Sequence, residues 1–65
     1  MKYRRLIAEM YARDISKDDL AILLGKSRRA ISNRINGKTE FTCIEVKTIM
    51  NTYFKDCTIN FVFAG

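Results

Sequence analysis

Residues 15–38 read ISKDDLAILLGKSRRAISNRINGK, and this stretch decides the fold because it holds two helix starts and two helix stops. Ser16 and Asp19 have the spacing of a capping box, in which each side chain accepts a hydrogen bond from the other's backbone N–H. Ile15 and Leu20 flank that box as a hydrophobic staple does. Gly25 can end the helix because glycine adopts the left-handed conformation at little cost. The stretch therefore opens with one short, capped helix.

A second short helix follows at once. Ser27 is its expected N-cap, and the helix is expected to run from Arg28 to about residue 35 or 36, where Asn36-Gly37 stops it. Ile31 and Ile35 are four residues apart and should both face inward. Over about residues 16–36 the sequence thus predicts two short helices joined by a tight turn.

Another helix is predicted on each side of this pair. Residues 3–13 should form a helix that ends near Asp14 and whose apolar face contains Leu6, Ile7, Met10 and Tyr11. A basic amphipathic helix lying on a membrane is the alternative, but four further apolar segments need a partner. Residues 41–54 begin with a full T-x-x-E capping box at Thr42 and continue with an apolar stripe at the spacing of one helical face, namely Val46, Ile49, Met50, Tyr53 and Phe54.

Residues 55–65 form a tail with two possible structures. Asp56 or Thr58 could cap one more short helix, whereas residues 58–63 alternate polar and apolar and are rich in strand-forming types. The core has limited room for so many apolar side chains, so we expect part of the tail to mediate dimerisation through Phe61 and Phe63. Folding back as a fifth helix is the competing expectation.

Composition narrows the class of protein. Sixty-five residues make one domain over residues 1–65, and a net charge of +5 favours a polyanionic partner, either nucleic acid or an anionic surface, over mere solubility. The chain has no histidine, and its two cysteines, Cys43 and Cys57, do not complete a zinc site. We expect both to be buried free thiols, with a disulfide as the alternative. No apolar run is long enough to span a membrane and no signal peptide is evident, so a cytoplasmic protein is expected.

Basic residues gather in the second helix of the central pair. No acidic residue lies between Lys26 and Lys38, and five basic residues do: Lys26, Arg28, Arg29, Arg34 and Lys38. Arginine presents a planar fork that matches the O6 and N7 acceptors of guanine, and asparagine can pair in two ways with adenine. Most charge runs are simply solvated helix faces, but this run coincides with the second helix of a capped pair, which favours DNA reading.

The central stretch resembles the Cro and repressor (XRE-like) helix-turn-helix family, and most closely its small phage-encoded members. The resemblance covers about residues 15–54 and rests on Leu20-Ala21, Leu24-Gly25, Ser27, Ala30-Ile31-Ser32 and Asn36-Gly37-Lys38. It implies an all-α, lambda-repressor-like DNA-binding domain with four or five short helices around one core. It also implies a transcriptional regulator that binds a specific double-stranded DNA site, commonly a palindromic operator, as a homodimer.

The resemblance assigns roles by position. The residues implied to contact base edges are Arg28, Arg29, Ser32 and Asn33, and those implied to contact phosphates are Lys17, Ser27, Arg34, Asn36 and Lys38. One departure concerns a buried arginine of the first helix that pairs with a late glutamate in many members. Met10 and Ile35 occupy those places, so apolar packing is expected there. A second departure is that Ile31 and Ile35 are four apart where many members show three, which leaves the role of Arg34 open.

Other function classes are less well supported. The chain has no histidine to act as a general base and no Gly-rich phosphate loop, so we expect neither an enzyme nor a cofactor or metal. A thiolate at Cys43 would be favoured by its place in the first turn of a helix, but no partner base is in sight. The main alternative is an antirepressor-like module that binds another regulator. Unspecific RNA binding is disfavoured because no aromatic platform lies beside the basic stretch.

Overall fold

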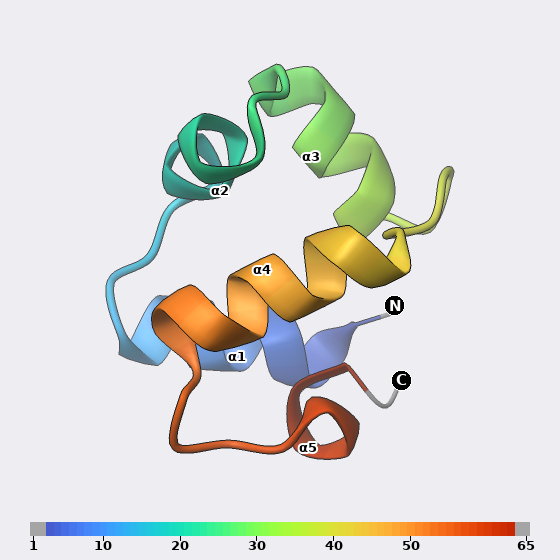
Figure 1. Ribbon diagram of the computed structural model, residues 1–65. Helices are drawn as coiled ribbons and strands as arrows, with labels where there is room; N and C mark the ends of the chain where they lie inside the picture. Colours follow the sequence, from blue (N-terminus) through green and yellow to red (C-terminus); the bar gives the residue numbers. More distant parts are fainter. Residues whose placement is uncertain (1–2, 64–65) are drawn as a thin grey trace.

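A computed structural model describes residues 3–63, which form five helices and no strand (Figure 1). The helices are α1 (Arg4–Ala12), α2 (Lys17–Leu24), α3 (Arg28–Ile35), α4 (Cys43–Tyr53) and α5 (Ile59–Phe63). In Figure 1, α2 and α3 form one side of the molecule, α1 and α5 the other, and α4 crosses between them. The prediction of an all-α domain is confirmed.

Both predicted capping boxes form. The Ser16 hydroxyl accepts from the backbone N–H of Asp19 at 3.1 Å, and the Asp19 carboxylate accepts from the N–H of Ser16 at 2.9 Å. At the start of α4, the N–H of Glu45 donates to Thr42 Oγ1 at 3.2 Å, while Glu45 Oε1 accepts from the N–H of Thr42 at 2.9 Å. Each box satisfies two backbone donors that the helix itself leaves without a partner, and so fixes where the helix begins.

One core joins all five helices, and its fully buried side chains are Leu6, Leu20, Ile31, Ile49, Phe54 and Val62. Tyr11 is not part of it, although the apolar pattern of α1 included it. Leu6 and Met10 are buried one turn apart, whereas the Tyr11 side chain is 90% exposed. One residue further along a helix the direction rotates by about 100°, which carries Tyr11 away from the core.

The tail folds back as a short helix. The backbone N–H of Phe61 donates to Thr58 Oγ1 at 3.1 Å, so Thr58, one of the two expected caps, satisfies a donor in the first turn of α5. A strand would have no neighbour to pair with, because residues 3–63 contain none. Residues 64–65 of the tail lie outside the described residues.

Phe63 packs against the core and is half-buried. Its ring meets the rings of Tyr3 and Phe41 edge to face, with centroids 5.9 and 5.6 Å away, and Tyr3 and Phe41 are 5.4 Å apart. The three rings tie the beginning of the chain and the loop before α4 to α5. Phe63 is half-buried in these contacts within its own chain, and its expected part in a dimer interface stays a prediction. Phe61 is 44% exposed.

Arg13 joins the end of α1 to the segment between α4 and α5. Its Nη1 and Nη2 donate to the two carboxylate oxygens of Asp56 at 3.0 Å each, and Nη1 also donates to the carbonyl of Tyr53 at 2.9 Å. The guanidinium lies 5.0 Å from the centre of the Phe54 ring. Asp56, the other expected cap of α5, instead anchors the chain between α4 and α5 to the end of α1.

The two cysteines are free, and only one is shielded. Cys57 is half-buried, and its Sγ accepts a hydrogen bond from Arg13 at 3.3 Å. Cys43 is exposed, contrary to the expectation of two buried thiols, because it lies in the first turn of α4 on the side away from the core. None of the helices in the described chain is long and apolar enough to cross a membrane.

Candidate nucleic-acid interface

Helix α3 is held by its two ends and by one face. The Ser27 hydroxyl caps it by accepting from the N–H of Ala30 at 3.1 Å, and Ile31 and Ile35 are buried against the core. Gly25, at φ 66, makes the sharp turn out of α2. Gly37, at φ 82, makes the turn after α3, where the N–H of Lys38 bonds to the carbonyl of Asn33 at 2.9 Å. These contacts fix α3 on the core, and the residues at its start remain exposed at the surface.

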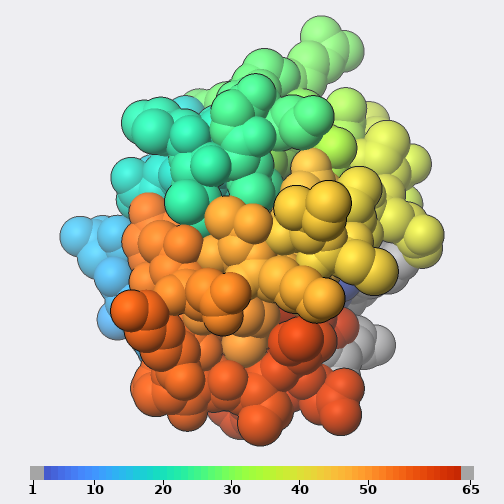
Figure 2. Space-filling view, viewed as in Figure 1, coloured from blue at the N-terminus to red at the C-terminus, as the bar shows by residue number. Residues whose placement is uncertain are grey.

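The four residues expected to contact bases lie together on α3. Arg28 and Arg29 are exposed at its first turn, and Ser32 and Asn33 follow one turn later, half-buried. Residues four apart share a helix face, so each arginine has one of the two polar side chains beside it. Side chains from the beginning of α3 project from the top of the molecule in Figure 2. The exposed arginines therefore lie at a part of the surface that can enter a groove while other residues meet the DNA backbone.

Three residues expected to contact phosphates lie at the two ends of α3. Ser27 precedes it, and Asn36 and Lys38 follow it, and all three are exposed. The Ser27 hydroxyl accepts the capping bond, so its own O–H remains able to donate to a phosphate oxygen. These donors bracket the arginines from both sides.

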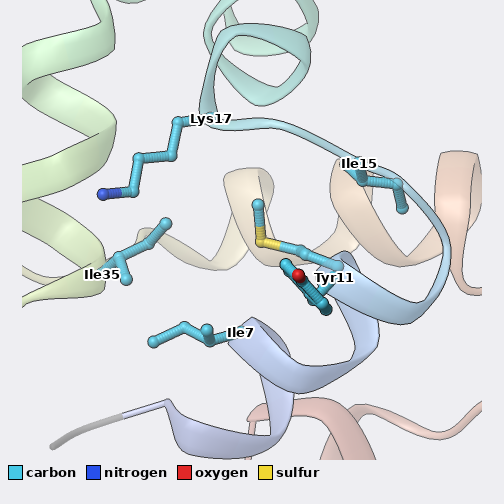
Figure 3. Close-up of a pocket in the computed structure, with 6 residues that line it drawn as sticks. Ile7, Tyr11, Ile15, Lys17 and Ile35 are labelled. Carbon is cyan, nitrogen blue, oxygen red and sulfur yellow. The ribbon is translucent and has the colours of Figure 1, made fainter.

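Lys17 reaches α3 from the start of α2. Its side chain extends toward α3 above Ile35 in Figure 3. Lys17 lines an apolar hollow of about 160 Å³ together with Ile7, Met10, Tyr11, Ile15 and Ile35. A lysine can bury its stem in this way while the ammonium stays in water. The structure thus brings Lys17, 11 positions before Arg28 in the sequence, to the same side as α3.

Arg34 has a different role from the one expected. Its Nε donates to Glu45 Oε1 at 2.9 Å, its Nη1 donates to the carbonyl of Ala30 at 3.3 Å, and its side chain is only 16% exposed. Arg34 lies in the last turn of α3, facing the start of α4, so it joins these two helices. We therefore remove it from the phosphate-contacting set. Met10 and Ile35 are buried and apolar as expected. An ion pair nevertheless joins α3 to α4, because Arg34, the residue before Ile35, is paired with Glu45.

The Glu45 carboxylate is ionised in this setting. Burial by itself would raise its pKa, but the N–H of Thr42 and the guanidinium of Arg34 bond to the charged form, and together they lower the pKa below its ordinary value. One oxygen, Oε1, accepts both bonds. Sequence reasoning assigned Glu45 only to the capping box, because nothing local indicates a partner 11 residues away.

The basic run at residues 26–38 contains no acidic residue, but in the folded chain acidic side chains from other segments lie beside it. Arg28 Nε lies 3.4 Å from Asp18 Oδ1, and Arg34 is paired with Glu45, so two of the five cations in residues 26–38 meet acids from outside that run. Lys26, Arg29 and Lys38 form no ion pair within residues 3–63. Lys17 likewise forms no ion pair within the described residues, so these four side chains carry positive charges that no ion pair offsets.

Searches of protein-family models, curated proteins and solved structures found no match to the chain. In the described part of the chain, no three cysteine, aspartate or glutamate side chains are grouped so that they could hold a metal ion.

Proposed function

We propose that the protein binds a specific sequence in double-stranded DNA and so regulates transcription. The observation that carries the proposal is the division of α3 into two faces. Ile31 and Ile35 are buried, while Arg28 and Arg29 are exposed at its beginning and donors lie at both ends. A recognition helix needs this arrangement, because base-reading side chains enter the major groove while flanking donors hold the backbone.

Arg28 and Arg29 are the proposed base-reading residues, with Ser32 and Asn33 beside them. Replacing either arginine by Ala should cost about 1–3 kcal/mol on the preferred site and relax the preference at one base pair. Titration of the wild type and each variant with the preferred and a random duplex measures both effects. An equal loss on the two duplexes would mean that the arginines contact only phosphates.

We further propose that two copies bind one palindromic operator. The described chain extends only 26 Å along its longest axis, whereas successive major grooves on one side of DNA are about 34 Å apart. One copy can therefore read one half-site. Ile59 and Phe61 of α5, 46% and 44% exposed, are the apolar side chains that we propose for the contact between copies.

Selection of bound duplexes from a random library tests class and symmetry together. A palindromic consensus with half-sites about one helical turn apart supports the proposal. Recovery of no consensus would refute sequence-specific binding.

The cytoplasm is the compartment that we propose, since DNA in a bacterial or phage-infected cell lies there and both cysteines are free thiols.

An antirepressor-like module that binds another regulator is the second candidate, and one observation favours it. Ile22 on α2 and Ile44 on α4 are 81% and 77% exposed, which is unusual for large apolar side chains outside an interface. In that case, Ile22→Ser and Ile44→Ser would abolish regulation in cells, while Arg28→Ala and Arg29→Ala would leave it intact. The DNA-binding proposal predicts that the two arginine variants lose regulation.

A further inference from the structure

Asp18 is an acidic side chain that lies beside a proposed base-reading arginine. It is in the first turn of α2, where its charge suits the positive end of the helix dipole, but the capping box of that helix uses Asp19. The Asp18 side chain is 65% exposed, and its Oδ1 lies 3.4 Å from Nε of Arg28. A carboxylate beside the phosphate backbone would weaken binding to any DNA. A role at the start of α2 does not by itself require that Asp18 lie next to a proposed base-reading residue.

The geometry of the pair bears on recognition. Of the five N–H donors of an arginine, the one at Nε is the one that faces Asp18 Oδ1, at the distance of an ion pair, 3.4 Å. The other two nitrogens, Nη1 and Nη2, form the end of the fork that can meet O6 and N7 of guanine together. A guanidinium with a carboxylate beside its Nε has fewer orientations to lose when it binds a base, and it is less able to turn aside to a phosphate.

We propose that Asp18 is a positioning residue that orients Arg28 toward guanine and so sets base preference in DNA recognition. This inference rests on the proposed DNA-binding function. It gives Asp18 two effects of opposite sign. Its charge lowers the affinity for every duplex through repulsion of phosphates, while its contact with Arg28 raises the discrimination between guanine and other bases at one position.

Asp18→Asn separates these effects, because asparagine keeps the shape and removes the charge. Dissociation constants would be measured for the selected site, for the same site with each base pair changed, and for a random duplex. We expect the preference for guanine at the Arg28 position to fall by about five- to tenfold. The affinity for the random duplex should rise. A variant that had merely lost structure would show a fall in both.

Asp14→Asn is the matched control. It makes the same change of charge, and Asp14 is exposed with φ 57, a left-handed conformation that asparagine also accepts. It should raise the affinity for random DNA modestly and leave the base preference unchanged. Thermal melting of both variants verifies that they are folded at the temperature of the titrations.

A second experiment tests whether Asp18 acts through Arg28. In an Arg28→Ala background, Asp18→Asn should have no further effect on base preference, because the side chain that it positions is gone. The proposal is overturned if Asp18→Asn leaves the preference of the wild type intact, or if it alters preference equally with and without Arg28. A wild type that selects no DNA sequence would instead refute the proposed function itself, and this inference with it.

Discussion

Arginine residues in this chain divide into those that hold the fold and those that face outward. Arg13 and Arg34 each donate several hydrogen bonds within the chain and are largely shielded, whereas Arg28 and Arg29 are exposed at the start of α3. The same residue type thus serves stability at two positions and, as proposed, recognition at two others. Substitutions should separate the two roles.

Arg34→Ala should destabilise the protein, since it removes a hydrogen bond to a carboxylate that is itself only 9% exposed. We expect a loss of about 1.5–3 kcal/mol in the free energy of unfolding. Arg29→Ala, the matched control on the same helix, should change it by less than about 0.5 kcal/mol, because it removes an exposed side chain. Urea unfolding of the two variants measures both values. Equal stabilities would show that the ion pair between α3 and α4 contributes nothing.

Acid should weaken the fold through Glu45 and Asp56. A hydrogen bond from Arg13 lowers the pKa of Asp56, and the pKa of Glu45 is lowered despite its burial. A carboxyl group whose pKa is lower in the folded state binds fewer protons there, so its stabilisation is complete above the ordinary pKa and is lost as pH falls through the folded pKa.

The free energy of unfolding should therefore fall as the pH drops below roughly 4, the ordinary range of these carboxyl groups. Glu45→Gln should be less stable than the wild type at neutral pH and should show a shallower fall in acid. Its amide can still complete a capping box, so the loss reports the ion pair. Urea unfolding at a series of pH values gives both slopes. Identical slopes would contradict the role assigned to Glu45.

Helix starts were predictable from the sequence because their signals are local. Each capping box joins residues three apart, so Ser16 with Asp19 and Thr42 with Glu45 could be recognised without knowledge of the fold. The apolar stripes were predicted less completely. Tyr11 fits the stripe of α1 but lies at its edge, and only the position of the neighbouring helices decides which edge is covered.

Thr42→Ala tests whether the capping box at the start of α4 stabilises the protein. Loss of the cap should reduce the free energy of unfolding by about 0.5–2 kcal/mol. Thr52→Ala is the matched control, because Thr52 is exposed in the last turn of the same helix and alanine is the better helix former. It should be neutral or slightly stabilising. If both variants melt like the wild type, the cap has no effect on the stability of α4.

Contacts between distant parts of the chain escaped sequence reasoning. Arg13 and Asp56 are 43 residues apart, and no spacing rule relates them. The same holds for Asp18 and Arg28, which meet only because the turn at Gly25 brings the start of α2 beside the start of α3. The tail was ambiguous for the same reason, since residues 58–63 fit a strand locally but have no strand to pair with in the described fold. Tertiary structure decided each case.

The whole molecule should bind DNA with a steep dependence on salt. Each phosphate neutralised contributes roughly −0.9 to the slope of log K against log salt concentration. Lys17→Gln and Lys38→Gln should each make the slope less steep by about 1. Lys55→Gln is the control, because Lys55 lies in the connection between α4 and α5, at the end of the molecule away from α3 (Figure 1).

Titrations at several salt concentrations give these slopes. A nearly flat slope for the wild type would exclude DNA as the partner, and an equal effect of Lys55→Gln would show that the contacts are not confined to the α2–α3 side.

Two copies should occupy one palindromic duplex, and Phe61→Ala should weaken that assembly without unfolding the chain. Phe61 is 44% exposed, and Cζ of Arg5 lies 4.6 Å from the centre of its ring, whereas Phe63 packs against the core and the ring of Tyr3. Sedimentation of the wild type and the variant, with and without the duplex, measures the number of copies bound. A wild type that binds the duplex as one copy at high protein concentration would refute the dimer.

The bond from Arg34 to Glu45 has a consequence for how this protein can be reprogrammed. Glu45 Oε1 accepts the capping bond of α4 and the bond from Arg34 of α3. The orientation of α3 against α4 therefore depends on residues that are separate from those on the outer surface of α3. Arg28, Arg29, Ser32 and Asn33 can therefore be randomised while residues 34 and 45 stay fixed. Helix α3 should then keep the same orientation in each member of the library. A change at either fixed residue would instead re-aim every outward side chain together. The fold is in this sense modular, because the residues of the proposed reading surface can be exchanged while Arg34 and Glu45 are kept.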